Sequence, residues 1–445
     1  MNCERAAACG AGHCGRFQLL IRPGQGAVVI NALSGAWLGG DEAEIRSVFK
    51  YLQGGTPQVQ LAAHLQDLIQ GSSIAEPPIV ATGFEPELAV LHVGHTCNLS
   101  CEYCYAPKDQ ARMSPEIIDA TCRFLAQVPR GLFIQFMGGE PLLHLREIGG
   151  IVDKLREGRS QFPTSCGIQT NGFHLLDEGV LSFLQARDIY FGLSFDGPRG
   201  MSAARFGART DELQRQVEDL IERLHECDIQ FGVLAVLNRY NAHRLEELLD
   251  WCLNRGIPRL LLTPVLPQPD NRELAVDEGE AAEALRSLFR IWVDRGLYRK
   301  IEIENFRSLE DNLTDLHRGY MCRKYPCGAG REQVAINTDG WIYPCDYLTG
   351  LAQFALGHVS LHTPADIAGS GLLLRLHEQT ALARLGDCGT CGFLSICGHC
   401  VGSSYFNGGG VAGKRLSCQS DKLVIEEMLF ELLWNSEYSS HVVSR

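Results

Sequence analysis

The chain has 445 residues, of which 45% are hydrophobic and 21% charged, and its formal net charge is −13. This composition is typical of a globular protein with two or three domains, and the negative charge argues against a nucleic-acid partner, because phosphate binding needs clustered Lys and Arg. No apolar run predicts a membrane span, and the first residues lack the basic and apolar parts of a signal peptide. We therefore expect a cytoplasmic protein.

The chain has 18 cysteines. In a cytoplasmic protein, this number predicts metal ligation and not disulfides. Residues 1–15, rich in Gly and Ala, predict a flexible tail that carries Cys3, Cys9 and Cys14. Four more cysteines fall singly in predicted strands and helices, where we expect them to fill the core: Cys122, Cys166, Cys227 and Cys252. The others form one group near residue 100 and a long C-terminal array.

Residues 16–80 predict a small α+β domain of winged-helix type. The segments RFQLLIRP and GAVVIN are typical of two strands around the turn PGQG. EAEIRSVFKYLQ and VQLAAHLQDLIQ are typical of two helices, and the stretch GSSIAEPP predicts a linker after them.

Over residues 87–300, short apolar runs alternate with helix-like segments, such as the one that begins at Ser114 with a Ser cap and a Pro in its first turn. Six strand–helix units predict an α/β fold with a parallel sheet and helices outside it. The pattern does not distinguish an open sheet from a barrel. The predicted strands are residues 87–93, 132–138, 166–172, 189–195, 229–237 and 259–265.

Three cysteines, Cys97, Cys101 and Cys104, follow the first predicted strand in the run VGHTCNLSCEYCYAP. Three thiolates can hold three irons of a [4Fe–4S] cube and leave the fourth iron without a protein ligand, whereas four cysteines are the usual complement. The alternative is an amphipathic helix with three buried cysteines, but Asn98 and Ser100 interrupt the run. The spacing resembles the signature of the radical SAM enzymes, in which the open iron binds the amino and carboxylate groups of S-adenosylmethionine (SAM).

This resemblance implies a partial (β/α)6 barrel over residues 87–300, with the active site at the carboxyl ends of the strands. It also implies that an electron splits SAM into methionine and a 5′-deoxyadenosyl radical, which abstracts a hydrogen atom from the substrate. A low-potential donor, flavodoxin or ferredoxin, would supply the electron.

Polar residues at the predicted strand ends resemble the SAM-binding positions of the family. In the family, a GGEP stretch binds the SAM amino group, and its glycines allow close backbone approach. The chain departs from the family after DGP, where Met201, Ser202 and Ala203 replace a common His-Asp. Arg205 is therefore either the partner of the SAM carboxylate or a surface arginine. The resemblance assigns SAM contacts to Tyr103, Gly138, Gly139, Glu140, Asn171, Ser194, Asp196 and Arg205.

The C-terminal third predicts a bridging helix over residues 301–321, a cysteine-rich domain over 322–420, and a helix and tail over 421–445. The cysteine-rich part holds a GxxxxC element that ends at Cys345, and then a CxxC pair followed by a second CxxC pair. This resembles the SPASM extension of radical SAM peptide-modifying enzymes, which holds two auxiliary [4Fe–4S] clusters, for three clusters in all. Structural zinc is the alternative for paired cysteines.

The family pattern interleaves the ligands of the two auxiliary clusters. It assigns auxiliary cluster I to Cys322, Cys327, Cys345 and Cys400, and auxiliary cluster II to Cys388, Cys391, Cys397 and Cys418. The chain has only Gly398 and His399 between the last two cysteines of its CxxC pairs, where the family has three residues. This departure leaves open whether Cys400 is a ligand, and whether Cys322 or His399 ligates cluster I.

The region before the cysteine triad resembles the leader-recognition module of ribosomal-peptide maturases, which binds a precursor peptide by strand addition. The alternative is an accessory domain that only packs on the barrel. Together these resemblances predict a peptide maturase that forms thioether or carbon–carbon crosslinks, with an auxiliary cluster as acceptor of the second electron.

Asp346, directly after Cys345, resembles the proposed general base of sulfatase maturases. A formylglycine-generating enzyme is therefore the second prediction, with Asp346 as catalytic residue. A non-catalytic iron–sulfur protein, for electron transfer or as a scaffold, is the third.

Overall fold

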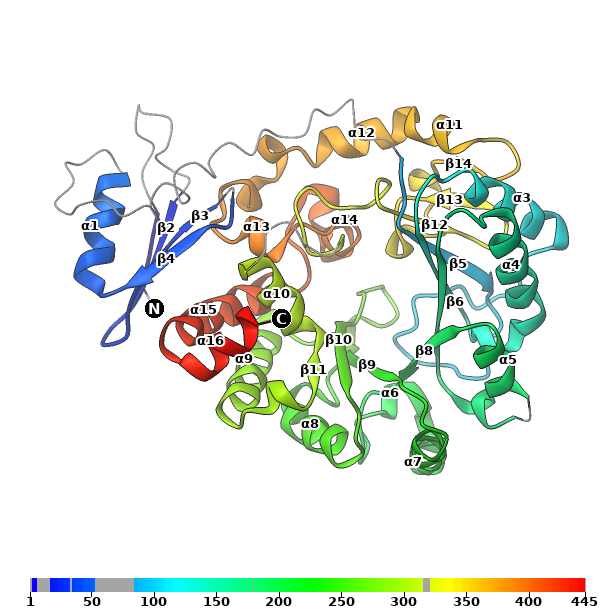
Figure 1. Cartoon of the computed structure of the whole chain (residues 1–445), viewed down its shortest axis with the longest axis horizontal. Helices are drawn as coiled ribbons and strands as arrows, with labels where there is room; N and C mark the ends of the chain where they lie inside the picture. Colours follow the sequence, from blue (N-terminus) through cyan, green and yellow to red (C-terminus); the bar gives the residue numbers. More distant parts are fainter. Residues whose placement is uncertain are drawn as a thin grey trace.

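The structure is a computed structural model that describes residues 2–5, 17–32, 34–52, 84–177, 179–314 and 321–444, with the backbone alone for residues 2–5. Figure 1 shows a small sheet near the N-terminus and a large curved sheet with helices on its outer side. Cys9, Cys14, the second predicted N-terminal helix and the predicted linker lie outside the described residues.

The small sheet is antiparallel, with the strand order β1-β2-β3-β4. Its strands are β1 (Asn2–Arg5), β2 (Phe17–Arg22), β3 (Gly26–Asn31) and β4 (Trp37–Gly40), and helix α1 (Glu42–Leu52) follows. The sequence predicts a flexible tail for residues 2–5 and no strand at 37–40. Both pair instead with the open edges of the predicted β2–β3 hairpin, because an uncovered edge leaves backbone groups unpaired.

The small sheet has two apolar faces, because β2 and β3 carry hydrophobic side chains at successive positions and these alternate between the faces. Leu19 and Val29 pack with residues of α1 in a separate small core. Leu20 and Val28, on the other face, belong to the main hydrophobic core. The small sheet therefore lies between α1 and the rest of the protein.

The large sheet contains six successive parallel strands that coincide with the six predicted ones. They are β5 (Leu88–Gly94), β6 (Leu132–Gly138), β7 (Thr164–Thr170), β8 (Ile189–Ser194), β9 (Gly232–Leu237) and β10 (Arg259–Pro264). Each strand pairs with the next one in the chain, so their carboxyl ends lie at one edge of the sheet. The prediction of a parallel α/β fold is confirmed.

Helices cover the outer face of these strands (Figure 1). They are α3 (Pro115–Ala126), α4 (Leu145–Gly158), α5 (Val180–Ala186), α7 (Thr210–Glu226), α8 (Leu245–Asn254) and α9 (Glu278–Asp294), whereas the four-residue α6 (Ala203–Phe206) lies beside the cysteine loop, where the Glu102 N–H donates to the Ala204 carbonyl. The first of them begins as predicted, since the Ser114 side chain accepts a hydrogen bond from the Ile117 N–H and Pro115 stands at the first position.

Four short strands extend the large sheet at both ends. They are β11 (Glu302–Ile303), β12 (Gln333–Ile336), β13 (Trp341–Tyr343) and β14 (Gly357–His358). β11 pairs with β10, and β12 pairs in parallel with β5, so the full order is β11-β10-β9-β8-β7-β6-β5-β12-β13-β14. The cysteine-rich segment thus supplies β12, which covers the edge of β5.

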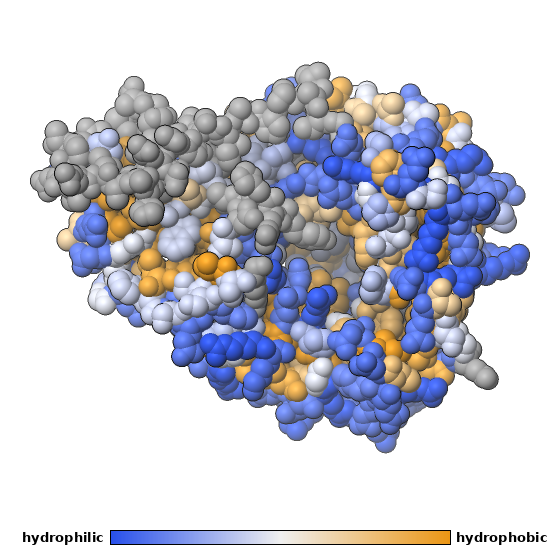
Figure 2. Space-filling view, in the orientation of Figure 1, coloured by the Kyte–Doolittle hydropathy of each residue, from blue (hydrophilic) through white to orange (hydrophobic). Residues whose placement is uncertain are grey.

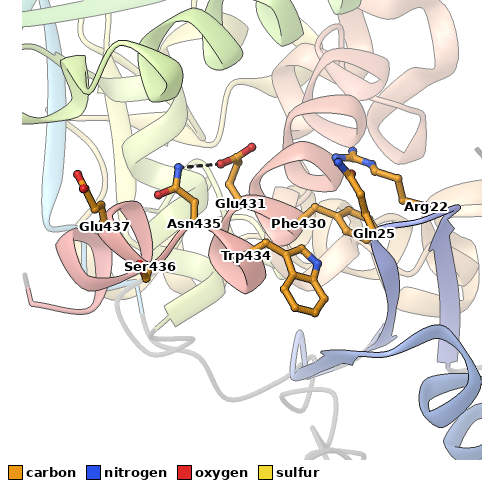
Figure 3. Close-up of a pocket in the computed structure, with 8 residues that line it drawn as sticks. All are labelled: Arg22, Gln25, Phe430, Glu431, Trp434, Asn435, Ser436 and Glu437. Carbon is orange, nitrogen blue, oxygen red and sulfur yellow. Dashed lines mark hydrogen bonds between the residues drawn. The ribbon is translucent and has the colours of Figure 1, made fainter.

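The remaining helices belong to the C-terminal third. They are α10 (Glu304–Thr314), α11 (Pro364–Ala368), α12 (Gly371–Gln379), α13 (Leu394–Cys397), α14 (Val401–Ser404), α15 (Cys418–Trp434) and α16 (Ser436–Val443). Helix α15 packs against α9, and it also contacts the small sheet. The Arg22 guanidinium lies 4.2 Å from the centre of the Phe430 ring and 3.1 Å from the buried Glu427 carboxylate. Figure 3 shows the surface hollow at this junction, where Trp434 extends toward the β2–β3 hairpin.

Hydrophilic side chains spread over the helical rim of the molecule, with hydrophobic ones between them (Figure 2). Among the helices of the described residues, none has the length and apolar composition needed to cross a bilayer. Of the four cysteines predicted in the core, three are buried, but Cys227 is exposed because it caps the carboxyl end of α7.

Arg159 offers a test of the fold. Its Nη1 donates to the carbonyls of Leu125 (2.6 Å) and Val128 (2.7 Å), and its Nη2 donates to the Arg130 carbonyl. We predict that Arg159→Met lowers the free energy of unfolding by about 2–4 kcal/mol, because buried carbonyls would lose their donors. The shift of the urea midpoint measures this effect.

A matched control for this variant is Arg209→Met, which removes an exposed guanidinium paired with Glu212. Exposed pairs contribute about 0–1 kcal/mol, so the midpoint should move little. Equal shifts for the two arginines would contradict the role assigned to Arg159.

Candidate functional site

The three cysteines of the triad lie in the loop that follows the carboxyl end of β5. The thiols of Cys97, Cys101 and Cys104 are close enough to interact electrostatically, and none forms a disulfide. Burial raises the pKa of Cys101 to about 12, although the Arg205 charge opposes this shift. Cys97 is exposed, and Cys101 and Cys104 are half-buried. Such a group of free thiols suits a metal centre, because bound iron compensates the thiolate charge that burial disfavours.

Two glycines hold this loop against the end of β6. A Cβ on Gly138, whose φ is +124°, would lie 2.2 Å from the Gly94 carbonyl oxygen, and one on Gly139 would lie 2.2 Å from the Thr96 carbonyl oxygen. The N–H groups of Gly139 and Glu140 donate to these same two carbonyls at 2.9 and 2.8 Å. Glycine is therefore required here by the packing of the cysteine loop itself.

The Glu140 carboxylate is buried and has three protein donors. It accepts hydrogen bonds from the Leu142 N–H (3.0 Å), the Thr170 hydroxyl (2.7 Å) and the Asn171 N–H (2.9 Å). Burial raises its pKa, while these hydrogen bonds oppose the shift. A carboxylate has about four acceptor positions, so this carboxylate fastens β6 to β7 and keeps one position for a further donor.

Asn171 and Ser194 stand at the carboxyl ends of β7 and β8 and also have protein partners. The Asn171 side-chain amide donates to the Asn98 side-chain oxygen at 2.7 Å, and this contact ties β7 to the cysteine loop. The Ser194 hydroxyl accepts a hydrogen bond from the Gln169 amide at 2.8 Å. Asn171 and Ser194 therefore lie at the same edge of the sheet as the cysteine triad.

Asp196 joins the other predicted SAM residues. Its carboxylate accepts hydrogen bonds from the Tyr103 hydroxyl (2.5 Å), Arg205 Nη2 (2.8 Å) and the Val236 N–H (3.0 Å). Tyr103 and Arg205 are both buried, so the alternative of a surface Arg205 is wrong. Arg205 Nε has no hydrogen-bond partner among the described residues, so a buried donor beside the triad is free for an anionic group.

Asp346 lies where the cysteine loop meets the C-terminal third. Its carboxylate oxygens are 2.7 Å from His92 Nε2 and 2.6 Å from the Tyr105 hydroxyl. Burial disfavours ionisation, but the His92 and Tyr105 hydrogen bonds outweigh this effect, and the pKa of Asp346 lies below its ordinary value. Sequence reasoning missed His92 and Tyr105, since each is an ordinary strand or loop residue until tertiary structure brings it to Asp346.

The four cysteines predicted for auxiliary cluster I come together behind β13. Cys345 interacts electrostatically with the other three, which are Cys322, Cys327 and Cys400. Burial, together with the neighbouring Cys400, raises the pKa of Cys327 to about 11. The structure thus groups Cys400 with this set even though the spacing before it is one residue shorter than in the family.

The four cysteines predicted for auxiliary cluster II line one pocket: Cys388, Cys391, Cys397 and Cys418. Burial raises the pKa of Cys418 to about 11. His399 also lines this pocket, beside the second group of cysteines. Burial lowers the pKa of His399 to about 4, which leaves the imidazole neutral.

The donor set fits iron–sulfur clusters. The fifteen cysteines whose side chains the structure describes are all free thiols, and eleven of them form the three groups. In the described part of the chain, no three His, Cys, Asp or Glu side chains converge on a position for a single metal ion. Cysteine thiolates are the usual ligands of [4Fe–4S] clusters, so groups made up of cysteines alone suit such clusters.

Residues 91–252 match the family model of the Radical SAM superfamily. A serine-type anaerobic sulfatase-maturating enzyme of Klebsiella aerogenes is 25% identical over 324 residues, which cover 68% of this chain and 76% of that enzyme. The sporulation killing factor maturation protein SkfB of Bacillus subtilis is 24% identical over 330 residues, or 71% of this chain and 74% of SkfB.

Two solved structures share the fold. The enzyme anSMEcpe with bound AdoMet and the Kp18Cys peptide has a TM-score of 0.66 and 20% identity, and the match covers 78% of this chain and 98% of that one. Streptococcus suis SuiB bound to the precursor peptide SuiA has a TM-score of 0.56 and 16% identity, with 89% and 97% covered. With its cysteine triad at the carboxyl end of β5, this chain is therefore an enzyme with a radical SAM domain over residues 91–252, similar to the sulfatase-maturating enzymes and SkfB, and the radical SAM family implies SAM and a [4Fe–4S] cluster as cofactors.

Proposed function

We propose that this enzyme is a maturase of a ribosomal precursor peptide, which it converts to an oxidised product with a thioether or carbon–carbon crosslink. The observation that carries the proposal is the pair of four-cysteine groups beyond the triad, which supports two auxiliary clusters and three [4Fe–4S] clusters in total. When bound, SAM and the triad's cluster supply a 5′-deoxyadenosyl radical that removes a hydrogen atom from the peptide.

The residues around the triad would position SAM. Arg205 keeps a free Nε–H for the SAM carboxylate, and Asp196 holds the guanidinium in place through Nη2. The Tyr103 ring, fixed by the same carboxylate, would lie beside the adenine. Backbone groups of Gly138 and Gly139, and the one open acceptor position of Glu140, would accept the SAM ammonium.

A crosslink between two peptide residues is a net oxidation, so a second electron needs an acceptor. The auxiliary cysteine groups supply a route for it, since Cys345 of the first group adjoins Asp346, which bonds to Tyr105 of the triad's loop. A flavodoxin or ferredoxin would provide the electron that starts the reaction.

The small sheet would hold the precursor's leader by strand addition at an outer edge. The match to SuiB covers 89% of this chain, whereas the residues from β5 onward make up only about four fifths of it. The match therefore includes residues of the N-terminal region. That neighbour is bound to a precursor peptide, which supports a peptide partner for this chain.

Formylglycine formation, as in sulfatase maturases, is the second candidate. It is favoured by the relatives in the Klebsiella enzymes and by Asp346, which the His92 and Tyr105 hydrogen bonds keep ionised and ready to accept a proton. The N-terminal sheet favours the precursor peptide instead, because the anSMEcpe match leaves about a fifth of the chain uncovered.

Iron analysis tests the three-cluster assignment. Anaerobically purified protein should hold roughly twelve irons, and replacing Cys388, Cys391, Cys397 and Cys418 by Ala should remove roughly a third of them. Replacing the triad instead should leave roughly two thirds and abolish 5′-deoxyadenosine formation under reductant. Zinc in the C-terminal region, or an intact protein that makes no 5′-deoxyadenosine, would contradict the proposal.

The role of Arg205 is tested by SAM binding. We predict that Arg205→Met weakens SAM binding by roughly 10- to 100-fold, because a charge-assisted contact to the carboxylate contributes about 1.5–3 kcal/mol. Equilibrium binding of SAM to the reconstituted protein measures the change, and Arg209→Met on the surface serves as the control. If Arg205→Met bound SAM as tightly as the parent, Arg205 would not contact the SAM carboxylate, and its role would be limited to pairing with Asp196.

Mass spectrometry of a precursor peptide incubated with the enzyme distinguishes the two candidate reactions. We expect a product lighter by two hydrogens with crosslinked fragments, and an aldehyde would instead establish formylglycine formation. Asp346→Asn should slow product formation by roughly 100-fold or more, as expected when a general base is lost, while 5′-deoxyadenosine still forms. Full product yield in Asp346→Asn would exclude Asp346 as the base.

A further inference from the structure

Two buried nitrogens in the pocket of the second cysteine group have no hydrogen-bond partner among the described residues. They are His399 Nδ1 and Arg415 Nε, and both side chains line the pocket together with the four cysteines. A buried N–H without an acceptor costs about 1–3 kcal/mol, so such groups are expected to have a partner that the protein itself does not provide.

The orientation of the His399 ring leaves Nδ1 as a donor. The Ser404 hydroxyl lies 3.3 Å from Nε2, and when it donates to this neutral ring nitrogen, the ring proton stands on Nδ1. The main chain of His399 is held as well, because its N–H donates to the Lys324 carbonyl at 3.2 Å. The backbone of Gly413 also lies near this ring, but Nδ1 makes no hydrogen bond with the described residues. His399 lines the pocket, and its exposed fraction is only 1%.

Arg415 adds a positive charge to the same wall. Its Nη1 donates to the Cys397 carbonyl at 2.7 Å, and its Nε lies 3.3 Å from an Asp421 oxygen without hydrogen-bond geometry. The Asp421 carboxylate also accepts a hydrogen bond from Arg323 at 2.6 Å. Two guanidinium groups thus share one carboxylate, and one positive charge is left uncompensated between the two cysteine groups.

We propose that His399 and Arg415 donate hydrogen bonds to the sulfur atoms of a cluster held by the second cysteine group and raise its reduction potential. This inference rests on the proposed function, which supplies the cluster. Hydrogen bonds to sulfur, net charge and solvent exposure set the potentials of such centres. His399 and Arg415 are positioning and tuning residues here, and neither contacts the peptide.

The expected direction of the change in reduction potential follows from the charges around the cluster. One-electron reduction of a cluster adds a negative charge to a buried site that already holds four thiolates. A nearby cation and an N–H dipole stabilise that added charge, and the low local dielectric strengthens their effect. Removing Arg415 or His399 should therefore lower the potential, whereas removing the Asp421 charge should raise it.

The test uses the full-length, anaerobically reconstituted protein with Ala at Cys97, Cys101 and Cys104, so that only auxiliary clusters contribute. EPR-monitored titration with dithionite gives the midpoint potentials. We expect His399→Phe and Arg415→Met to shift a midpoint to lower potential and to change its EPR signal. Asp421→Asn should shift it to higher potential, a result that a damaged site would not produce.

Two matched variants separate charge from packing. Arg415→Lys keeps the charge and should retain most of the potential, whereas Arg209→Met removes an exposed charge that does not line this pocket and should change little, because solvent screens that charge. If all variants had the same midpoint potentials and EPR spectra, with iron and sulfide content equal to the parent, this inference would be overturned and the proposed function would stand. A parent without iron in the second cysteine group would overturn the proposed function and the inference with it.

Discussion

The parallel pairing of β12 with β5 is the constraint on which the arrangement of the site depends. β5 ends in the cysteine triad and pairs with β6 on its other side, so one strand lies between the GGEP loop and the cysteine-rich segment. The chain after β12 therefore turns back beside the triad. Two contacts secure this junction: His95 lies 3.1 Å from the Asn337 side chain, and His92 lies 2.7 Å from Asp346.

A buried or half-buried aspartate accompanies each of the three cysteine groups. Asp196 lies beside the triad, Asp346 adjoins Cys345 of the first auxiliary group, and Asp421 stands three residues after Cys418 of the second. Each carboxylate takes donors from segments far apart in the chain, including a Tyr or Arg side chain. Buried carboxylates are costly unless they are paired, so these aspartates specify how loops with little regular structure close around the sites.

Local patterns predicted much of this molecule. The six parallel strands and the start of α3 at Ser114 follow from periodicity and capping within short stretches. The membership of the two auxiliary cysteine groups came from the resemblance to the SPASM pattern, because their cysteines are interleaved along the chain. The short strands were missed for a physical reason: β4 has only four residues, two of them glycine, and β1 carries no alternating apolar pattern. Such strands form because a neighbouring edge is available, which no local pattern records.

By itself, the sequence determined the metal-binding residue types, the parallel α/β core and the class of radical chemistry, because each depends on spacing within one segment. Only the tertiary structure decided that Arg205 is buried against Asp196, that His92 and Tyr105 share Asp346, and that His399 faces the second cysteine group. These partners lie up to 254 residues apart, and burial sets their charge state and free donors. Which polar atoms are left for a cofactor is therefore a property of the packed chain.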